Sequence, residues 1–364
     1  LPSSAEAGDQ IILADYARNW GTNAITIDSN GLLFQGETDV YIVDYDTAGQ
    51  AVNLVYSGST VGWTPASDIV SAFEPVPPPT QKALFGYGFA GSSAVSITNL
   101  VNSSGVVATD TTGVGTARYL LGAAGYGGDK AIFGYGHDGS SVVSMSNLVN
   151  NSGVVAADVT GVGTARFFLA AANYGTDKAI FGYGRTTAIT NLVSNSGVVA
   201  TDTAGVGTGR EALAAASYGG DKAIFGYGYS GSNVSLTNLV DSSGVVASDV
   251  TGVGTARQGL AAASYGTDKV IFGYGTTGSY TAVTNLVSNT GVVAADVSGV
   301  GSPRGGLAAA SYGGDKALFG YGVDSGGDSS WTNLVNNLGV VAADVTGVGT
   351  DRINLAAAGY STSA

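Results

Sequence analysis

The sequence is dominated by one phrase that recurs six times at nearly constant spacing. Lys-Ala-(Leu/Ile)-Phe-Gly-Tyr-Gly, once with Val in place of Ala, returns after 48, 48, 44, 47 and 47 residues. Asn-Leu-Val, Gly-Val-Val-Ala, an Arg and an Ala-rich run follow each copy in that order. Such a period predicts a repeat architecture in which each copy is one supersecondary unit. The copies begin at Lys82, Lys130, Lys178, Lys222, Lys269 and Lys316.

Each copy contains four short apolar runs, typified by Ala-Ile-Phe-Gly-Tyr, Thr-Asn-Leu-Val, Val-Val-Ala and Leu-Ala-Ala-Ala. Turn residues such as Gly-Gly-Asp and Asn-Ser-Ser-Gly separate these runs. Runs this short predict strands, because helices need more residues. Four strands per copy, at a period of about 40–50 residues, are typical of a propeller blade. Residues 82–364 are therefore expected to form a six-bladed β-propeller.

The two ends of the repeat array predict how the ring closes. The first copy has no Ala-rich run before Lys82, whereas the last copy ends with an additional one at Leu355–Tyr360. We expect this C-terminal strand to complete the first blade, which removes two exposed sheet edges. The small side chains of the Ala-rich runs suit inner strands, which crowd around a propeller axis.

Residues 1–73 do not share the repeat and are predicted to form a small all-β domain for attachment or oligomerisation. Trp20 and Trp63 are its expected core aromatics. Residues 74–81 hold four of the seven prolines and predict an extended, semi-rigid linker. The expected strands of the N-terminal domain include Gln10–Leu13, Ala24–Ile27 and Val52–Tyr56.

Composition excludes several classes of function. The chain has no Cys and one His, so disulfides, cysteine catalysis and multi-histidine metal sites are not expected, and neither is a cofactor. A net charge of −13 without a basic run argues against nucleic-acid binding. No apolar run approaches the roughly 18 residues of a membrane span, so membrane insertion is not expected.

The repeat resembles the kelch motif. Its Tyr-Gly-Gly-Asp-Lys-Ala-Ile-Phe-Gly-Tyr-Gly segment is similar to the kelch turn and second strand, and Thr-Ala-Arg with the Ala-rich run is similar to the kelch Arg and first strand. The kelch di-glycine stands here as Gly-Tyr-Gly, and the usual Trp of the fourth strand is absent. The resemblance implies a divergent, kelch-like propeller.

The amino-acid sequence of the repeats is also similar to repeat arrays in virion proteins of tailed bacteriophages. Thr-Gly-Val-Gly-Thr-Ala-Arg and Phe-Gly-Tyr-Gly carry this resemblance in the repeats. In the N-terminal domain, Leu1-Pro2-Ser3-Ser4, Ala14-Asp15-Tyr16-Ala17, and Leu54-Val55-Tyr56 with Gly62-Trp63 resemble tail-fibre modules, especially of marine phages. The resemblance implies an extracellular virion protein with other virion proteins as partners and a homotrimer as one possible assembly.

Two segments differ strongly among the otherwise constant copies: the loop after Phe-Gly-Tyr-Gly and the pair of residues after the repeat Arg. Since strands alternate in direction, both are expected on one face of the propeller, which makes that face a candidate binding surface. Neutral drift of surface loops is the alternative. The candidate aromatics for stacking on sugar rings are Tyr119, Phe167, Phe168, Tyr229, Tyr280 and Trp331. The candidate polar groups are Asp138, Arg185, Glu211, Gln258, Asn354 and His137, the last expected to be an exposed loop residue.

A repeated Asp lies eight residues before each repeat Arg, as in Asp110 with Arg118 and Asp158 with Arg166. This spacing predicts that the two ends of one loop meet in an ion pair or in hydrogen bonds to the loop backbone. An anion-binding ring of six Arg side chains is the alternative.

The leading hypothesis is a phage receptor-binding protein, a tail fibre or similar appendage, that presents the variable face to host-surface glycans. The first alternative is a structural decoration protein of capsid, neck or tail without a ligand. The second is a glycan-degrading depolymerase, which would need two carboxylates in one pocket. No such pair stands out, so no enzymatic activity is expected.

Overall fold

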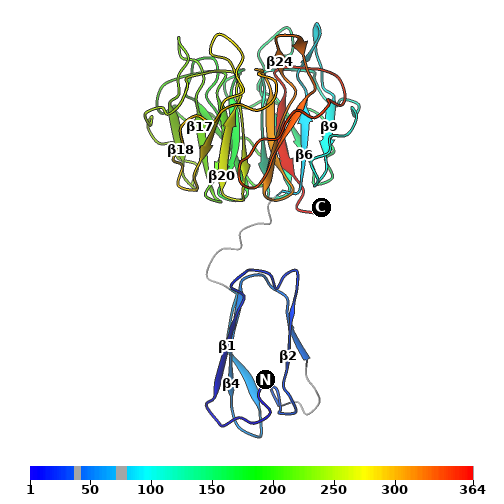
Figure 1. The fold of residues 1–364 in the computed structure, drawn as a ribbon, viewed down its shortest axis with the longest axis vertical. Coiled ribbons are helices and arrows are strands. Elements are labelled where there is room, and N and C mark those ends of the chain that lie inside the picture. Colours follow the sequence, from blue (N-terminus) through cyan, green and yellow to red (C-terminus); the bar gives the residue numbers. More distant parts are fainter. Residues whose placement is uncertain (37–41, 71–79, 364) are drawn as a thin grey trace. The chain divides into compact units, whose positions relative to one another are not determined.

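A computed structural model describes residues 1–36, 42–70 and 80–363. The described chain consists of strands and connections without a helix, which confirms the predicted all-β class. It divides into two compact units, Leu1–Val76 and Pro77–Ala364 (Figure 1). The predicted linker at 74–81 lies outside the described residues except for Thr80 and Gln81.

The first unit is a small β domain with a three-stranded antiparallel sheet and a separate strand pair. The sheet has the order β1-β4-β5, and β2 pairs with β3. Trp63 is 1% exposed and lies edge-on to Tyr56, whereas Trp20 is half-buried beside Tyr45. Both tryptophans therefore belong to the core that the sequence predicted. The strands are β1 (Gln10–Ala14), β2 (Ile25–Asp28), β3 (Ile42–Tyr45), β4 (Gln50–Tyr56) and β5 (Trp63–Val70).

The second unit contains six three-stranded antiparallel sheets, each with an Ala-rich inner strand, a Phe-Gly middle strand and an Asn-Leu-Val outer strand. The inner strands are β27 (Ala356–Tyr360), β10 (Gly122–Tyr126), β13 (Ala170–Tyr174), β16 (Ala214–Tyr218), β19 (Ala261–Tyr265) and β22 (Ala308–Tyr312). The middle strands are β6 (Lys82–Gly86), β11 (Lys130–Gly134), β14 (Lys178–Gly182), β17 (Lys222–Gly226), β20 (Lys269–Gly273) and β23 (Lys316–Gly320). The outer strands are β9 (Thr98–Val101), β12 (Ser146–Val149), β15 (Thr190–Val193), β18 (Thr237–Val240), β21 (Thr284–Val287) and β26 (Thr332–Val335).

The C-terminal strand completes the first sheet, as the sequence predicted. β27 pairs antiparallel with β6, with Ala356 opposite Gly86 and Tyr360 opposite Lys82. The inner strands also contact one another in cyclic succession, from β10 through β13, β16, β19 and β22 to β27 and back to β10. Every inner strand therefore has an inner strand on each side.

Neighbouring sheets interlock through a phenylalanine and a glycine. A Cβ on Gly86 would lie 2.6 Å from Cζ of Phe133 in the next sheet, and a Cβ on Gly320 would lie 2.6 Å from Cζ of Phe85. Each Phe ring thus fills the space that its neighbour's missing side chain leaves, which gives close packing without a void. The sixth sheet uses this contact to hold the first.

The predicted fourth strand, Val-Val-Ala, is not a regular strand. In the first copy it forms only isolated bridges, from Val107 to Val101 and from Thr111 to Thr98. The side-chain amide of Asn99 donates to the carbonyl of Ala108 at 2.9 Å, in the interval between the bridges. This bond takes a carbonyl that a regular ladder would use, so the prediction of a fourth short strand in each copy was wrong. Two short hairpins, β7 (Phe89–Ala90) with β8 (Ser93–Ala94) and β24 (Val323–Asp324) with β25 (Gly327–Asp328), complete the fold.

Candidate binding face

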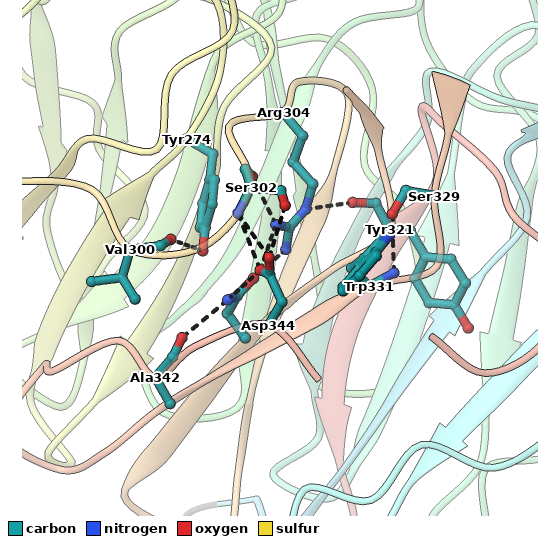
Figure 2. Close-up of polar contacts among 10 residues, drawn as sticks. Tyr274, Val300, Ser302, Arg304, Tyr321, Ser329, Trp331, Ala342 and Asp344 are labelled. Carbon is teal, nitrogen blue, oxygen red and sulfur yellow. Dashed lines mark hydrogen bonds and ion pairs between the residues drawn. The ribbon is translucent and has the colours of Figure 1, made fainter. Parts of the chain in front are cut away.

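Each repeat Arg joins two sheets rather than closing its own loop. Arg304 donates from Nε to the carbonyl of Tyr321 at 2.9 Å and from Nη2 to Oδ1 of Asn333 at 2.6 Å (Figure 2). Its guanidinium also lies over the ring of Tyr274, 4.5 Å from the centroid. Tyr274 belongs to the preceding sheet, whereas Tyr321 and Asn333 belong to the following one. We call this arrangement the inter-sheet clasp.

The aspartate of each clasp comes from the following sheet. Asp344 Oδ1 lies 3.7 Å from Arg304 Nη1, and Asp344 accepts hydrogen bonds from the backbone N–H and hydroxyl of Ser302 (Figure 2). In the same way, Arg118 pairs with Asp158 at 3.7 Å, and Asp110 pairs with Arg352 at 3.6 Å. The predicted contact between Asp110 and Arg118 is therefore wrong, because the connection that carries each Arg crosses to the next sheet.

Burial also contradicts the alternative of an anion-binding Arg ring. All six guanidinium side chains are at most 1% exposed, which leaves no space for an anion to reach them. The clasps hold rigidly the residues that follow each Arg, and those residues belong to one of the two variable segments. The six buried arginines are Arg118, Arg166, Arg210, Arg257, Arg304 and Arg352.

The two variable segments meet at one end of the sheets, which we call the variable end. Tyr119 and His137 exchange backbone hydrogen bonds of 3.0 and 2.9 Å, and Glu211 exchanges 3.0 and 2.8 Å bonds with Tyr229. Gln258 bridges to Thr276 in the same manner. The hairpin β24–β25 lies at this end of the second unit, opposite the end where the chain terminates (Figure 1).

Five rings form a continuous aromatic run across the first three sheets. Successive centroids from Phe89 to Tyr119, His137 and Phe167 are 5.0, 5.4 and 6.1 Å apart, and Phe167 is 5.5 Å from Phe168. His137 is half-buried within this run, so the expectation of an exposed loop residue was wrong. Phe89 was absent from the sequence-based set, although it occupies the same position after Gly-Tyr-Gly as His137.

The candidate polar residues differ in whether their side chains already make hydrogen bonds within the protein. The carboxylate of Asp138 accepts the backbone N–H groups of Ser140 and Ser141, and these bonds hold its pKa below the ordinary value. By contrast, the side chains of Arg185, Glu211, Gln258 and Asn354 make no hydrogen bond or ion pair with any described residue. Arg185 is exposed, with its guanidinium 5.4 Å from the Phe167 centroid.

The remaining candidate aromatics lie apart from the aromatic run. Tyr280 is 38% exposed, and a Cβ on Gly305 would lie 3.4 Å from its ring. Trp331 is 41% exposed beside the start of β26, where its backbone N–H donates to the hydroxyl of Ser329 (Figure 2). Tyr229 is half-buried in its bridge with Glu211. The aromatic surface is therefore concentrated on one half of the variable end.

A ring of backbone hydrogen bonds surrounds the centre of the variable end. The N–H of Leu120 donates to the carbonyl of Asn354, and the N–H of Phe168 donates to Leu120. The chain of bonds continues from Ala212 to Phe168 and onward until it returns to Asn354, with donor–acceptor distances of 2.7 to 2.9 Å. We call the six residues of this ring the central rim: Leu120, Phe168, Ala212, Gly259, Gly306 and Asn354.

The central rim opens into a pocket of about 80 Å³. One leucine from each copy lines it, and each leucine is only 5% or 6% exposed. Sequence reasoning missed this pocket, although the leucine recurs three residues after every repeat Arg. We call these residues the leucine floor: Leu121, Leu169, Leu213, Leu260, Leu307 and Leu355.

None of the described segments is a helix that is long and apolar enough to cross a membrane. Within the same residues, no group of three His, Cys, Asp or Glu side chains is arranged to hold a metal ion.

The sequence was also compared with known proteins. No protein-family model matches the chain, and no curated protein matches it.

Proposed function

We propose that residues 82–364 form a closed six-bladed, kelch-like β-propeller. The cyclic contacts of the inner strands and the pairing of β27 with β6 support this arrangement. The central rim adds one closed cycle of hydrogen bonds. At the opposite end of the sheets, a second cycle runs from Gly127 to Asp177 and onward through the copies, returning through Ser361 and Asp129. Six equivalent sheets with closed cycles at both ends are what a propeller requires.

We further propose that the protein is a receptor-binding component of a phage virion whose variable end binds host-surface glycans. The aromatic run carries this proposal. Its five rings form one surface at the end where the six copies differ most, and aromatic faces stack well on the apolar faces of sugar rings. Three polar side chains of the variable end have unused hydrogen-bonding groups that are available to sugar hydroxyls. They belong to Arg185, Glu211 and Gln258.

The virion assignment rests on the resemblance of the repeats and the first unit to tail-fibre modules. In this proposal the first unit attaches to other virion proteins or forms a homotrimer. Several copies of a weak site on one particle would then act through their effective concentration. The aromatic run provides the surface that a decoration protein without a ligand does not need.

The test is binding of the full chain to a broad glycan array and to isolated bacterial surface polysaccharides. Phe167→Ala removes the ring that joins His137 to Phe168 and supports Arg185. Leu338→Ala is the matched control, because Leu338 is an exposed apolar residue in the turn after β26, at the opposite end of the sheets.

We expect Phe167→Ala to weaken glycan binding at least tenfold and Leu338→Ala to leave it unchanged. A folded full chain that binds none of the glycans, even when multimerised, would overturn the proposal in favour of a structural virion component. Shortening of a polysaccharide during the incubation would identify the depolymerase alternative instead.

A further inference from the structure

The central pocket has room for a substituent of a sugar ring at its apolar base. Its volume is about 80 Å³, which is well above the roughly 10–15 Å³ that one bound water needs. The leucine floor cannot satisfy a buried hydroxyl, because it offers no hydrogen-bonding group. The bottom of the pocket is therefore suited to a methyl group.

The side chains of the central rim differ in size around this pocket. All six rim residues have positive φ, and Gly259 and Gly306, both at 61°, adopt it without a side chain. Leu120 at 58° and Phe168 at 55° adopt the same conformation with bulky side chains, which strains the backbone. Glycine makes the same rim hydrogen bonds, so closure of the ring does not require these side chains. Their effect is to form an apolar wall on one side and leave the glycine side open.

The rim also offers polar groups above the leucine floor. Asn354 completes the rim, and its carboxamide makes no hydrogen bond with any described residue. Gln258, beside Gly259, has a carboxamide that is equally unused within the described chain. A carboxamide both donates and accepts, so these side chains complement another amide. The pocket thus combines a site for a methyl group with the unused amide of Asn354 in its lining.

We infer that the central pocket binds the acetamido group of an N-acetylated sugar, with the methyl on the leucine floor and the amide against Asn354 at the rim. This inference rests on the proposed glycan-binding function and names the sugar class for it. The remaining rings of the glycan would then extend over the aromatic run, which begins at Phe168 on the rim itself.

The variant that tests the pocket is Ala212→Leu. Ala212 has a φ of 51°, and Leu120 already occupies the equivalent rim position at 58°, so the backbone accepts leucine there. Ala212 lines the pocket, so the added side chain fills pocket space. Thr176→Leu is the matched control, because Thr176 has a φ of 69° in the turn between β13 and β14, at the other end of the sheets.

The measurement is calorimetric titration of the full chain with tri-N-acetylchitotriose, its fully de-N-acetylated form and a fucose-containing trisaccharide. Saturation-transfer NMR reports which ligand protons contact the protein. We expect N-acetylated binding with strongest transfer to the acetyl methyl, a loss of at least tenfold in Ala212→Leu, and no change in Thr176→Leu. Asn354→Ala should weaken binding several-fold while leaving Phe168 in place.

Equal binding of the acetylated and de-N-acetylated sugars, or unchanged affinity in Ala212→Leu, would overturn the inference. Tight binding of the fucose trisaccharide at the same pocket would also overturn it, since a 6-deoxy methyl carries no amide. If Phe167→Ala still abolishes binding of other glycans in these cases, the proposed function stands without the acetamido site. If no glycan binds the wild-type chain, the proposed function itself fails.

Discussion

Arg352 donates a hydrogen bond from Nη2 to Oδ1 of Asn99 at 2.5 Å, across 253 residues of sequence. The equivalent bond from Arg210 to Asn238 is 2.6 Å long and spans 28 residues. Both clasps use Nη2 on an outer-strand asparagine, but only the first joins the end of the repeat array to its beginning. The last repeat therefore binds the first sheet with the same kind of contact that Arg210 makes with its following sheet.

Removal of this guanidinium should loosen the first and sixth sheets selectively. Arg352→Ala removes the guanidinium that donates to Asn99 and faces Asp110, and loss of a hydrogen bond from a charged group costs about 1.5–3 kcal/mol. Hydrogen exchange should accelerate in β6, β23 and β27. Arg210→Ala is the control, and its effect should centre on β14 and β17. Identical exchange patterns in the two variants would contradict a position-specific role in closure.

The second glycine of Thr-Gly-Val-Gly-Thr should resist substitution for a steric reason. A Cβ on Gly115 would lie 2.3 Å from Asp158 Oδ1, and the φ of Gly115 is 73°. Gly128 has a similar φ of 77° but no atom within 4 Å of its Cβ position. Gly128→Ala should therefore cost about 1 kcal/mol from backbone strain alone. Gly115→Ala should cost roughly 2 kcal/mol more, because it also displaces a clasp carboxylate.

Chemical denaturation of the two variants measures this difference as a shift in midpoint at unchanged slope. Equal losses of stability would show that the clasp moves aside easily.

The Phe-Gly interlock predicts a second contrast between glycines, this time without backbone strain. A Cβ on Gly134 would lie 2.7 Å from Cζ of Phe181, whereas the nearest atom to a Cβ on Gly125 is 3.4 Å away. Gly134→Ala should destabilise the protein by about 1–3 kcal/mol through overpacking. Gly125→Ala should be neutral or stabilise it by about 0.5 kcal/mol. Thermal unfolding checks both, and a tolerated Gly134→Ala would contradict tight packing between sheets.

The clasp carboxylates predict acid sensitivity. Burial alone would raise the pKa of Asp158, but hydrogen bonds from Thr116 and Asn147, together with Arg118, outweigh it and lower the pKa below its ordinary value. In the unfolded chain an Asp has a pKa of about 3.9. The stabilisation is therefore present above about pH 4 and is lost as pH falls through the lower folded-state value. The same direction holds for Asp110, Asp202, Asp249, Asp296 and Asp344.

Urea midpoints measured from pH 6 to pH 2 should accordingly stay level and then fall steeply below about pH 4. Asp158→Asn should reduce the steepness, because one titrating group is removed. A midpoint that is constant down to pH 2 would mean that the clasps contribute no proton-linked stability.

Much of the fold could be predicted from the repeat because its constraints are local and act six times. Phe-Gly-Tyr-Gly and Asn-Leu-Val indicated strands by length and composition, and the surplus run at Leu355–Tyr360 indicated how the first sheet is completed. The position of the variable segments at one end followed from strand alternation alone. The strand predicted at Val-Val-Ala was wrong, because strand propensity does not reveal that the Asn99 side chain binds a carbonyl that the strand ladder would use.

Contacts between sheets depended on the tertiary structure. Asp110 and Arg118 are close in sequence, yet each binds a residue of a different sheet, since the connection between them crosses an interface that spacing does not encode. His137 likewise became part of an aromatic run because Tyr119 and Phe167 approach it from separate connections.

The sequence by itself determined the all-β class, the number of copies and the places where they differ, because strand formation and turn chemistry are decided within a few residues. Only the tertiary structure decided that six leucines line one central pocket, that the rim forms a closed cycle of hydrogen bonds, and that the aromatics gather on one half of the variable end. Those features depend on the rotation from each sheet to the next, which sets the distance between residues about 47 positions apart.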